Sequence, residues 1–340
     1  MARTQENPSN SSGFKPIDPK ATSARAVANR VKSEVQEANP SERRSGGQWY
    51  DRSHRDAVRI GSHIDPGKPI EGAQGYKEGV QRPGRQRLRG AELDAFHNMS
   101  KGERQQAADR GAGALAVVSP SHAGMTYEKS VPASHAAWDI NSSDMRHVNQ
   151  ANATSAVVSK TQGAVAAAKN ADKKGLGSPA VMAEVTAAHE HASAVANTAA
   201  DTARAQPHVA GTMLKHVSSV ASIGQAHELL GGEKTAEQVL PMEVKTGAYY
   251  QNIRDPKHSR RATIDGRSHD IGVGRTLGWG VNRGLGGKAR YGKIEEGHQI
   301  AADEMGMMPH QAQAVSWVHN KHKVEDSGLS RDEYDKQYNG

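Results

Sequence analysis

Lys245 and Asp265 are the residues of this chain whose types and spacing point to chemistry. They stand twenty positions apart, between apolar segments, in the stretch LPMEVKTGAYYQNIRDPKHSRRATIDGRSH. In a partly buried pocket, desolvation lowers the pKa of a lysine and raises that of an aspartic acid. Lys245 could therefore act as a nucleophile or proton donor, and Asp265 as an electrostatic stabiliser or base. A surface lysine at a helix start and an aspartate capping the next helix would give the same pattern.

Two short elements must position this pair. Lys245 stands where a helix begins, and Asp255-Pro256 ends that helix. Its apolar face comprises Ala248, Tyr249, Tyr250 and Ile253. The run 262–264 then carries Asp265 into a loop.

The remaining periodic segments predict a mainly α fold. Ser100 and Glu103 form a capping box that starts a helix running into the apolar stretch 114–118, which we expect at the centre of the fold. Further amphipathic helices are expected at 49–61, 213–231, 235–239, 291–305 and 309–323. No run has the alternation of a strand.

Composition shifts divide the chain into five parts. Residues 1–47 are polar and basic with few large hydrophobes, which predicts a disordered basic tail. Residues 48–143 and 207–323 form the two parts of one helical domain. Between them, 144–206 is an Ala-rich helical insertion, broken near Gly175, that reads as a hairpin or partner-docking arm. Residues 324–340 read as a charged, frayed tail.

Charge and residue usage narrow the class of protein. The formal net charge of +7 favours an anionic partner, of which nucleic acid is the commonest. The absence of cysteine excludes disulfide scaffolds and thiolate sites. No apolar run is long enough to span a membrane, and no signal peptide is present, which predicts a cytosolic protein. We expect no metal and no cofactor, because the histidine spacings, as at His189 and His191, do not suit a ligand set.

A basic, Gly-rich region follows the Lys245 helix and is the expected nucleic-acid surface. Its candidate phosphate-binding residues are Arg254, Lys257, Arg260, Arg261, Arg267, Arg275, Arg283, Lys288 and Arg290. Its glycines would let the backbone approach a phosphodiester, and Trp279 could stack on a base. A flexible, solvated basic loop would have the same composition.

Four segments in order resemble a family of uncharacterised proteins from actinobacteria-infecting phages. They are WYDRSHRDAVRIG, ALAVVSPSH, VKTGAYYQNI with ATIDGRSH, and YGKIEEGHQIAADEMGMMPHQAQAVSWV. The family pattern includes an Ile-Asp-Arg-His motif and a closing Gln-Ala-x-x-Trp helix. This resemblance implies a phage-encoded protein located in the host cytoplasm or, alternatively, in the virion.

A more distant similarity is to the helix-hairpin-helix DNA glycosylases. It rests on Leu240-Pro241 before Lys245, and on Ile264-Asp265 with His269 downstream. The resemblance implies a glycosylase-like helical domain in which the lysine attacks the sugar carbon or the aspartate stabilises positive charge on a flipped nucleotide. The chain departs from the pattern where Met242 and Glu243 replace the hairpin glycines. Extra residues before His269 leave that histidine either in the site or in a structural role.

Together these observations predict a nucleic-acid-binding protein, with DNA as its partner, whose glycosylase-like activity acts on a nucleobase or N-glycosidic bond. Lys245, Asp265 and His269 are the expected catalytic residues. The alternative is a non-catalytic DNA-associated or virion structural protein, in which the Ala-rich insertion docks a protein partner.

Overall fold

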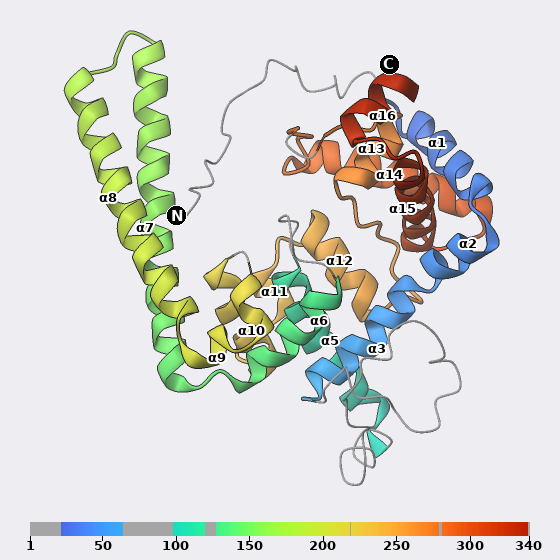
Figure 1. Ribbon diagram of the computed structural model, residues 1–340, viewed down its shortest axis with the longest axis horizontal. Coiled ribbons are helices and arrows are strands. Elements are labelled where there is room, and N and C mark those ends of the chain that lie inside the picture. Colours follow the sequence, from blue (N-terminus) through green and yellow to red (C-terminus); the bar gives the residue numbers. More distant parts are fainter. Residues whose placement is uncertain (1–21, 64–97, 120–126, 218, 279–280, 339–340) are drawn as a thin grey trace. The chain divides into compact units, whose positions relative to one another are not determined.

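The computed structural model describes residues 22–63, 98–119, 127–217, 219–278 and 281–338 (Figure 1). Within those ranges every regular element is a helix, which confirms the mainly α fold. The chain forms two compact units. Unit 1 combines the described residues up to Arg55 with those from Leu240 onward, and unit 2 comprises Asp56–Val239. The structure thus divides the chain at different places from the predicted boundaries after 143 and 206.

Unit 1 begins with two helices, α1 (Ala24–Glu37) and α2 (Pro40–Gly47). The side chain of Asn39 caps α2, and Glu42 completes a capping box with it. Valines recur every fourth residue on one face of α1, at Val27, Val31 and Val35, and all three are buried. The predicted disordered tail is therefore wrong for residues 22–47, while the part before residue 22 lies outside the described residues.

The second part of unit 1 contributes five helices. They are α12 (Lys245–Arg254), α13 (Gly266–Val273), α14 (Lys288–Met305), α15 (Pro309–Asp326) and α16 (Arg331–Tyr338). Helix α1 packs on α13, α14 and α15, and α2 packs on α15. The shared core includes Ile264, Ile271, Tyr291, Ile294 and Val315. The helix α16 corrects the predicted frayed tail at 324–340, because two of its side chains, Arg331 and Asp335, are buried.

Glycines set how closely the helices of unit 1 approach one another. A Cβ atom on Gly297 of α14 would lie 2.4 Å from Val27 Cβ on α1. On Gly46 of α2, it would lie 2.6 Å from the backbone of Val315 on α15. Because these glycines let the helix backbones approach closely, small side chains fill the space between the helices. A close-packed core therefore forms although aromatic residues make up only 4% of the chain.

Unit 2 is a second helical cluster. Its helices are the C-terminal part of α3 (Trp49–Gly61), α5 (Lys101–Val118), α6 (Tyr127–Ala136), η2 (Ala137–Asp139), α9 (Pro207–Ala210), η3 (Met213–His216), α10 (Val220–Gly231) and α11 (Ala236–Val239). The predicted capping box of α5 is present, with the Ser100 N–H donating to Glu103 over 2.7 Å. Residues 111–118 of α5 are buried, and the helix packs on α6 and α10. The segment expected at the centre of the fold is thus the centre of unit 2.

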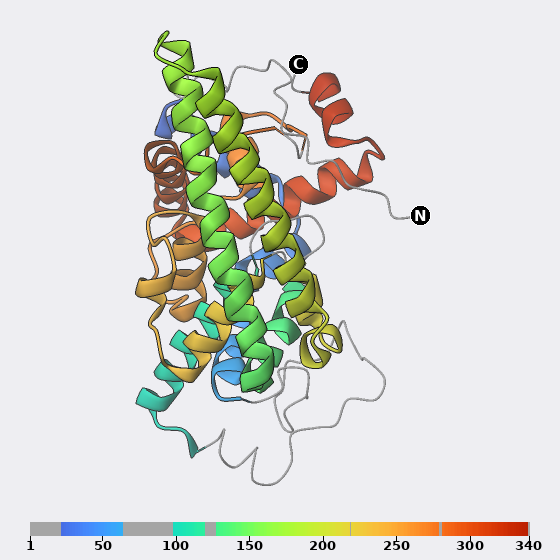
Figure 2. The ribbon, with the colours of Figure 1, turned by 90° about the vertical axis from the view of Figure 1, so that its left-hand side faces the viewer.

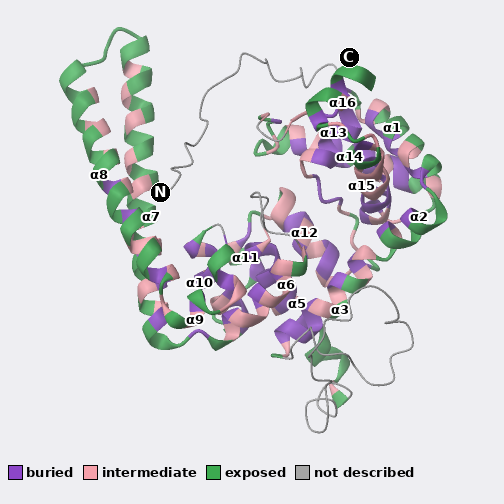
Figure 3. Ribbon diagram, viewed as in Figure 1, coloured by how far each residue is buried: buried purple, intermediate pink, exposed green. Residues whose placement is uncertain are grey.

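The Ala-rich segment of unit 2 forms two long helices, α7 (Ser142–Lys173) and α8 (Pro179–Arg204). They lie side by side along their length, joined by a turn in which Gly175 has φ of +70° (Figure 2). We refer to this hairpin as the arm. Its buried residues are Asp144, Val148, Ala151, Ala192, Ala196 and Ala203. From 152 to 191, by contrast, every residue of the arm is exposed or half-buried (Figure 3).

Candidate functional site

The Asp265 carboxylate is held by three hydrogen bonds in unit 1. Asp265 is the N-cap of α13, and its Oδ1 accepts from the Ser268 backbone N–H at 2.8 Å and from the Ser268 hydroxyl at 2.9 Å. Its Oδ2 accepts from the indole N–H of Trp317 at 2.9 Å. The carboxylate therefore both caps a helix, as the structural interpretation of the sequence expected, and has a fixed orientation.

Helix α15 supplies the outer support of this carboxylate. Gln313 donates through Nε2 to the Ser268 hydroxyl at 2.9 Å. Trp317 lies four residues later on the same helix face and binds Asp265 directly. These two contacts give a physical reason for the closing Gln-Ala-x-x-Trp pattern of the sequence. Neither residue was among the predicted site residues, although their spacing of four was visible.

Lys245 is the first residue of α12, and its side chain is half-buried. Burial lowers its pKa, and the Asp265 carboxylate acts in the opposite direction, so the two groups lie within electrostatic range of each other. Within the described part of the chain the Lys245 amine forms no hydrogen bond or ion pair. A desolvated amine beside a fixed carboxylate has the properties of a nucleophilic lysine.

A buried polar network connects the lysine helix to the aspartate segment. The Tyr50 hydroxyl lies 2.7 Å from Thr263 Oγ1 and 3.3 Å from Gln313 Oε1. Asn252 of α12 donates to the same threonine oxygen at 3.0 Å. Burial raises the pKa of Tyr50, which keeps its hydroxyl protonated. Thr263 precedes Asp265 by two residues. Its contacts with Tyr50 and Asn252 thus fix the distance between α12 and the Asp265 carboxylate.

Side chains of helix α14 form hydrogen bonds with the extended segment that leads into Asp265. The Tyr291 hydroxyl donates to the Ala262 carbonyl at 2.9 Å and accepts from the Ile264 N–H at 3.0 Å. Glu295 accepts from the Ala262 N–H at 3.0 Å. The backbone polar groups of this strand-like segment are therefore satisfied by side chains of one helix face.

Aromatic rings stand beside the lysine. Tyr249 follows Lys245 by one helical turn, and its ring centroid is 5.9 Å from that of Trp49. The buried Tyr50 ring packs edge-on against Trp49, with centroids 4.7 Å apart. Trp49 and Tyr249 are half-buried. Their ring planes are tilted by 44° to each other, so each ring offers its own apolar surface, of the kind on which a nucleobase stacks.

His269 was predicted as a catalytic residue, and its geometry gives it a structural role instead. The side chain is fully buried. Its Nδ1 lies 3.0 Å from Asp270 Oδ1, and its Nε2 lies 2.8 Å from the Arg290 guanidinium. Because both ring nitrogens have internal partners, no position remains at which His269 could exchange a proton with a ligand.

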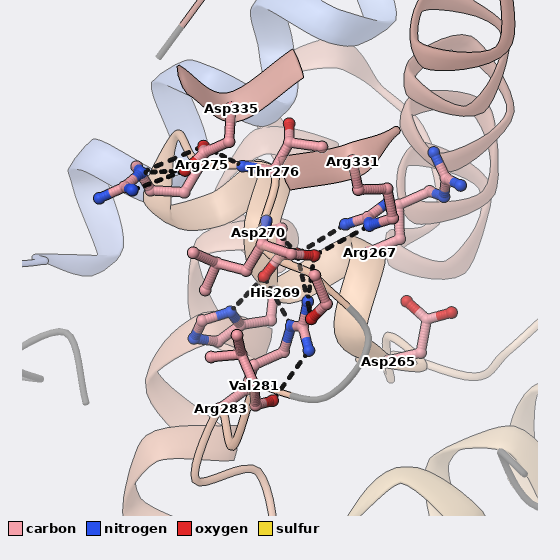
Figure 4. A network of polar contacts seen from close by, with 12 residues as sticks. Asp265, Arg267, His269, Asp270, Arg275, Thr276, Val281, Arg283, Arg331 and Asp335 are labelled. Carbon is pink, nitrogen blue, oxygen red and sulfur yellow. Dashed lines mark hydrogen bonds and ion pairs between the residues drawn. The ribbon is translucent and has the colours of Figure 1, made fainter. Parts of the chain in front are cut away.

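Asp270 is the centre of a buried ion-pair cluster (Figure 4). It accepts two hydrogen bonds of 2.7 Å from Arg283 and one of 2.7 Å from Arg331 of α16. Also on α16, Asp335 accepts from Arg275 and from the Thr276 N–H. The Gly-rich loop after α13 is therefore anchored to α13 and α16 by carboxylates.

Most of the predicted phosphate-binding arginines have such internal partners. Arg261 binds Glu295, Arg267 stacks on Trp317, Arg275 binds Asp335, Arg283 binds Asp270 and Arg290 binds His269. Withdrawing Arg261, Arg275 or Arg283 toward a phosphate would leave a buried carboxylate uncompensated, which is strongly unfavourable. Phosphate binding by these five residues stays a prediction, and it would require their internal contacts to be exchanged.

The other predicted contacts remain on the surface. Lys257, Arg260 and Lys288 are exposed, and Arg254 lies over the Tyr250 ring. Lys288 is 3.0 Å from Glu243, so it partly neutralises that carboxylate, which would otherwise repel a phosphate. Trp279 lies outside the described residues. Three of the predicted phosphate-binding cations are thus exposed, and they lie after α12 and at the start of α14.

Across the described ranges, no three His, Asp or Glu side chains converge in a way that could hold a metal ion. The helices found there are also too short or too polar to cross a bilayer.

Comparison with known proteins gives one family match. The model of a family of unknown function (DUF7178) matches residues 159–324, just under half of the chain. The matched region includes Lys245, Asp265, Gln313 and Trp317. No curated protein and no solved structure gives a match. The expected similarity to the helix-hairpin-helix glycosylases therefore stays a prediction.

Proposed function

We propose that this protein is a lysine-dependent enzyme that acts on an N-glycosidic bond in DNA. The observation that carries the proposal is the Lys245 amine. It is desolvated, it has no ion-pair partner in the described structure, and it stands within electrostatic range of a carboxylate that is fixed by three hydrogen bonds. Lysines with lowered pKa are the ones that attack electrophilic carbon at neutral pH.

In the proposed reaction the neutral Lys245 amine attacks C1′ of a nucleotide. The C1′–N bond breaks, and the base leaves with the electron pair of that bond and takes up a proton. Opening of the sugar ring then gives an imine between Lys245 and C1′, with the ring oxygen released as a hydroxyl. Asp265 stabilises the positive charge that develops on the sugar, because its fixed carboxylate lies within electrostatic range of the amine.

The surroundings of Lys245 support a nucleotide as the substrate. The rings of Trp49 and Tyr249 provide apolar surfaces for an extruded base, and an aromatic ring can stack on any base because every base has a π face. Lys257, Arg260 and Lys288 are exposed and would contact the backbone phosphates, Arg260 and Lys288 by exchanging their surface ion pairs with Asp303 and Glu243. The net charge of +7 has the sign that a DNA partner requires.

Imine trapping tests the proposal directly. The protein is incubated with a duplex that contains an abasic site, with borohydride present, and the cross-linked peptide is identified by mass spectrometry. We expect a reduced adduct on Lys245 that is lost in Lys245→Gln. We also expect a reduction of at least about ten-fold in Asp265→Asn, as removal of a charge-stabilising group predicts. Lys234→Gln, which alters an exposed lysine of unit 2, should leave the yield unchanged.

An adduct that forms equally in Lys245→Gln would overturn the proposal. The second candidate is a non-catalytic DNA-associated or virion protein, and the specific observation that favours it is the arm, whose surface is unusually apolar. If the protein has this second function, DNA binding would persist in Lys245→Gln, and no adduct would map to residue 245 in the wild-type protein.

A further inference from the structure

The arm carries most of the exposed apolar side chains of the described structure. Four of the five large exposed hydrophobics lie on it, namely Val157, Leu176, Val181 and Val195, and the fifth is Tyr338. Scattered single apolar residues are normal on a protein surface, but a concentration on one element marks an interaction site. The arm has this concentration although its interior is formed mainly by alanine.

A groove of about 430 Å³ runs between α7 and α8. Thr154 of α7 and Val195 and Thr198 of α8 lie in its wall. The lining consists of Ala, Val, Thr, Gln and His side chains and contains no Lys, Arg, Asp or Glu. A groove between two helices is the surface into which the side-chain ridges of further helices pack. Because its lining has no fixed charge, two copies of this groove can face each other without like charges in opposition.

The two helices of the arm carry opposite charge. Helix α7 has four basic residues and two acidic ones, a net charge of +2, and α8 has three acidic residues and one basic one, a net charge of −2. The side chains that create this difference include Lys160 and Lys169 on α7 and Glu184 and Glu190 on α8. All four are exposed, and within the described structure they make no ion pair.

We propose that the arm is a self-association surface, which pairs with the arm of a second copy of this chain to form a four-helix bundle. A two-fold axis parallel to the arm helices brings the two grooves together and places α7 of each copy opposite α8 of the other. That arrangement sets a positive helix against a negative one on both sides of the axis. It also buries the exposed Val195, which lines the groove, and a symmetric interface uses this same patch on both subunits. This inference is independent of the chemistry at Lys245.

Sedimentation equilibrium of the full chain over a range of concentrations tests the pairing. We expect a monomer–dimer equilibrium in the wild-type protein. Val195→Glu, which places a charge in the groove, should weaken the dimer by at least about ten-fold, because it buries an uncompensated charge at the interface.

Asn197→Glu is the control for this variant, because it adds the same charge to the same helix outside the groove. Asn197 is exposed and does not line the groove. It follows Val195 by two residues, which places it on nearly the opposite side of α8. The Asn197→Glu variant should keep the dimer within about two-fold of the wild-type constant, because its added carboxylate stays in water.

Charge reversal decides whether the partner is a second copy in this arrangement. The variant Lys169→Glu changes the net charge of α7 to 0, and Glu184→Lys changes that of α8 to 0. Each variant alone should dimerise less than the wild type, and an equimolar mixture of the two should dimerise again. The chain with both changes should also recover, because the charges at positions 169 and 184 then exchange signs.

A wild-type chain that stays monomeric at every concentration would overturn the inference. So would a dimer that is unaffected by Val195→Glu, because the association would then use another surface. Circular dichroism of each variant separates loss of pairing from loss of the arm helices.

Discussion

At the residue scale, Lys245 has a property that favours reactivity at the expense of stability. Its charge is partly desolvated, and within the described structure no ion pair compensates it. The sequence predicted both Lys245 and Asp265 as site residues from their spacing between apolar segments. It did not identify Trp317 or Gln313 as their supports, because the contact requires α15 to pack against the start of α13, which depends on distant parts of the chain.

Replacing the lysine should separate stability from activity. We expect Lys245→Met to raise the free energy of unfolding by about 1 kcal/mol, because an apolar side chain of similar length removes the cost of desolvating the charge. Chemical denaturation measures this change. The control Lys288→Met alters an exposed lysine and should change stability by less than about 0.5 kcal/mol. A destabilised Lys245→Met variant would show that the amine is anchored rather than available.

The pH dependence of amine labelling tests the coupling between the two groups. Only the neutral amine reacts with an acylating reagent, and burial lowers the pKa of Lys245 below its ordinary value of 10.5. We therefore expect Lys245 to become reactive at lower pH than the exposed Lys288. Since Asp265 raises the lysine pKa, Asp265→Asn should move the onset of labelling to still lower pH. An unchanged or higher onset in this variant would contradict the proximity of the two groups.

At the scale of elements, the helices are held together by polar side chains as well as by the core. Tyr291 and Glu295 of α14 form hydrogen bonds with the segment before Asp265. Trp317 of α15 donates a hydrogen bond to the Asp265 carboxylate. The sequence predicted α12, α14 and α15 from their apolar periodicity. It missed α1, because three valines four residues apart in an otherwise polar segment are a weak signal. Their burial depends on close packing against glycines elsewhere in the chain, as Val27 packs against Gly297. It missed α16 for a related reason, because the buried Arg331 and Asp335 look solvated until their partners are found.

Trp317→Phe should weaken the site while keeping the packing of α15. The ring remains, but Asp265 loses one of its three hydrogen bonds. We expect a loss of about 1 kcal/mol in stability and about ten-fold or more in adduct yield, as is typical of one hydrogen bond to a charged group. Trp138→Phe is a matched control in unit 2, because that indole donates to the Ile60 carbonyl. Equal adduct yields in the two variants would remove Trp317 from the site.

At the scale of the whole molecule, unit 1 is assembled from the two ends of the chain. Its core unites Val27, Val31 and Val35 of α1 with residues of α13, α14 and α15. The composition shifts of the sequence predicted the bounds of the Ala-rich arm. They did not predict that the two ends of the chain form one unit. Short-range patterns reveal periodicity, whereas pairing between α1 and α14 depends on complementary shapes that lie far apart in the sequence.

Blocking that pairing should destabilise unit 1. We expect Gly297→Val to lower the stability by about 2–3 kcal/mol, because its Cβ would overlap Val27, and such overpacking forces the helices apart. Deleting residues 1–47 should have a larger effect and expose the core to a hydrophobic dye. Thermal unfolding followed by circular dichroism measures both. A cooperative, native-like transition in the deletion variant would show that α1 and α2 are dispensable.

The placement of α1 has a consequence for the synthesis of the protein. Its partner α14 follows it by about 250 residues, and at translation rates of roughly 5–20 residues per second the wait is on the order of ten to fifty seconds. During that time the valine face of α1 emerges from the ribosome without its native neighbours, while the sequence of unit 2 is completed. Nascent chains should therefore be captured by chaperones through the α1 segment until the last third of the protein has been made.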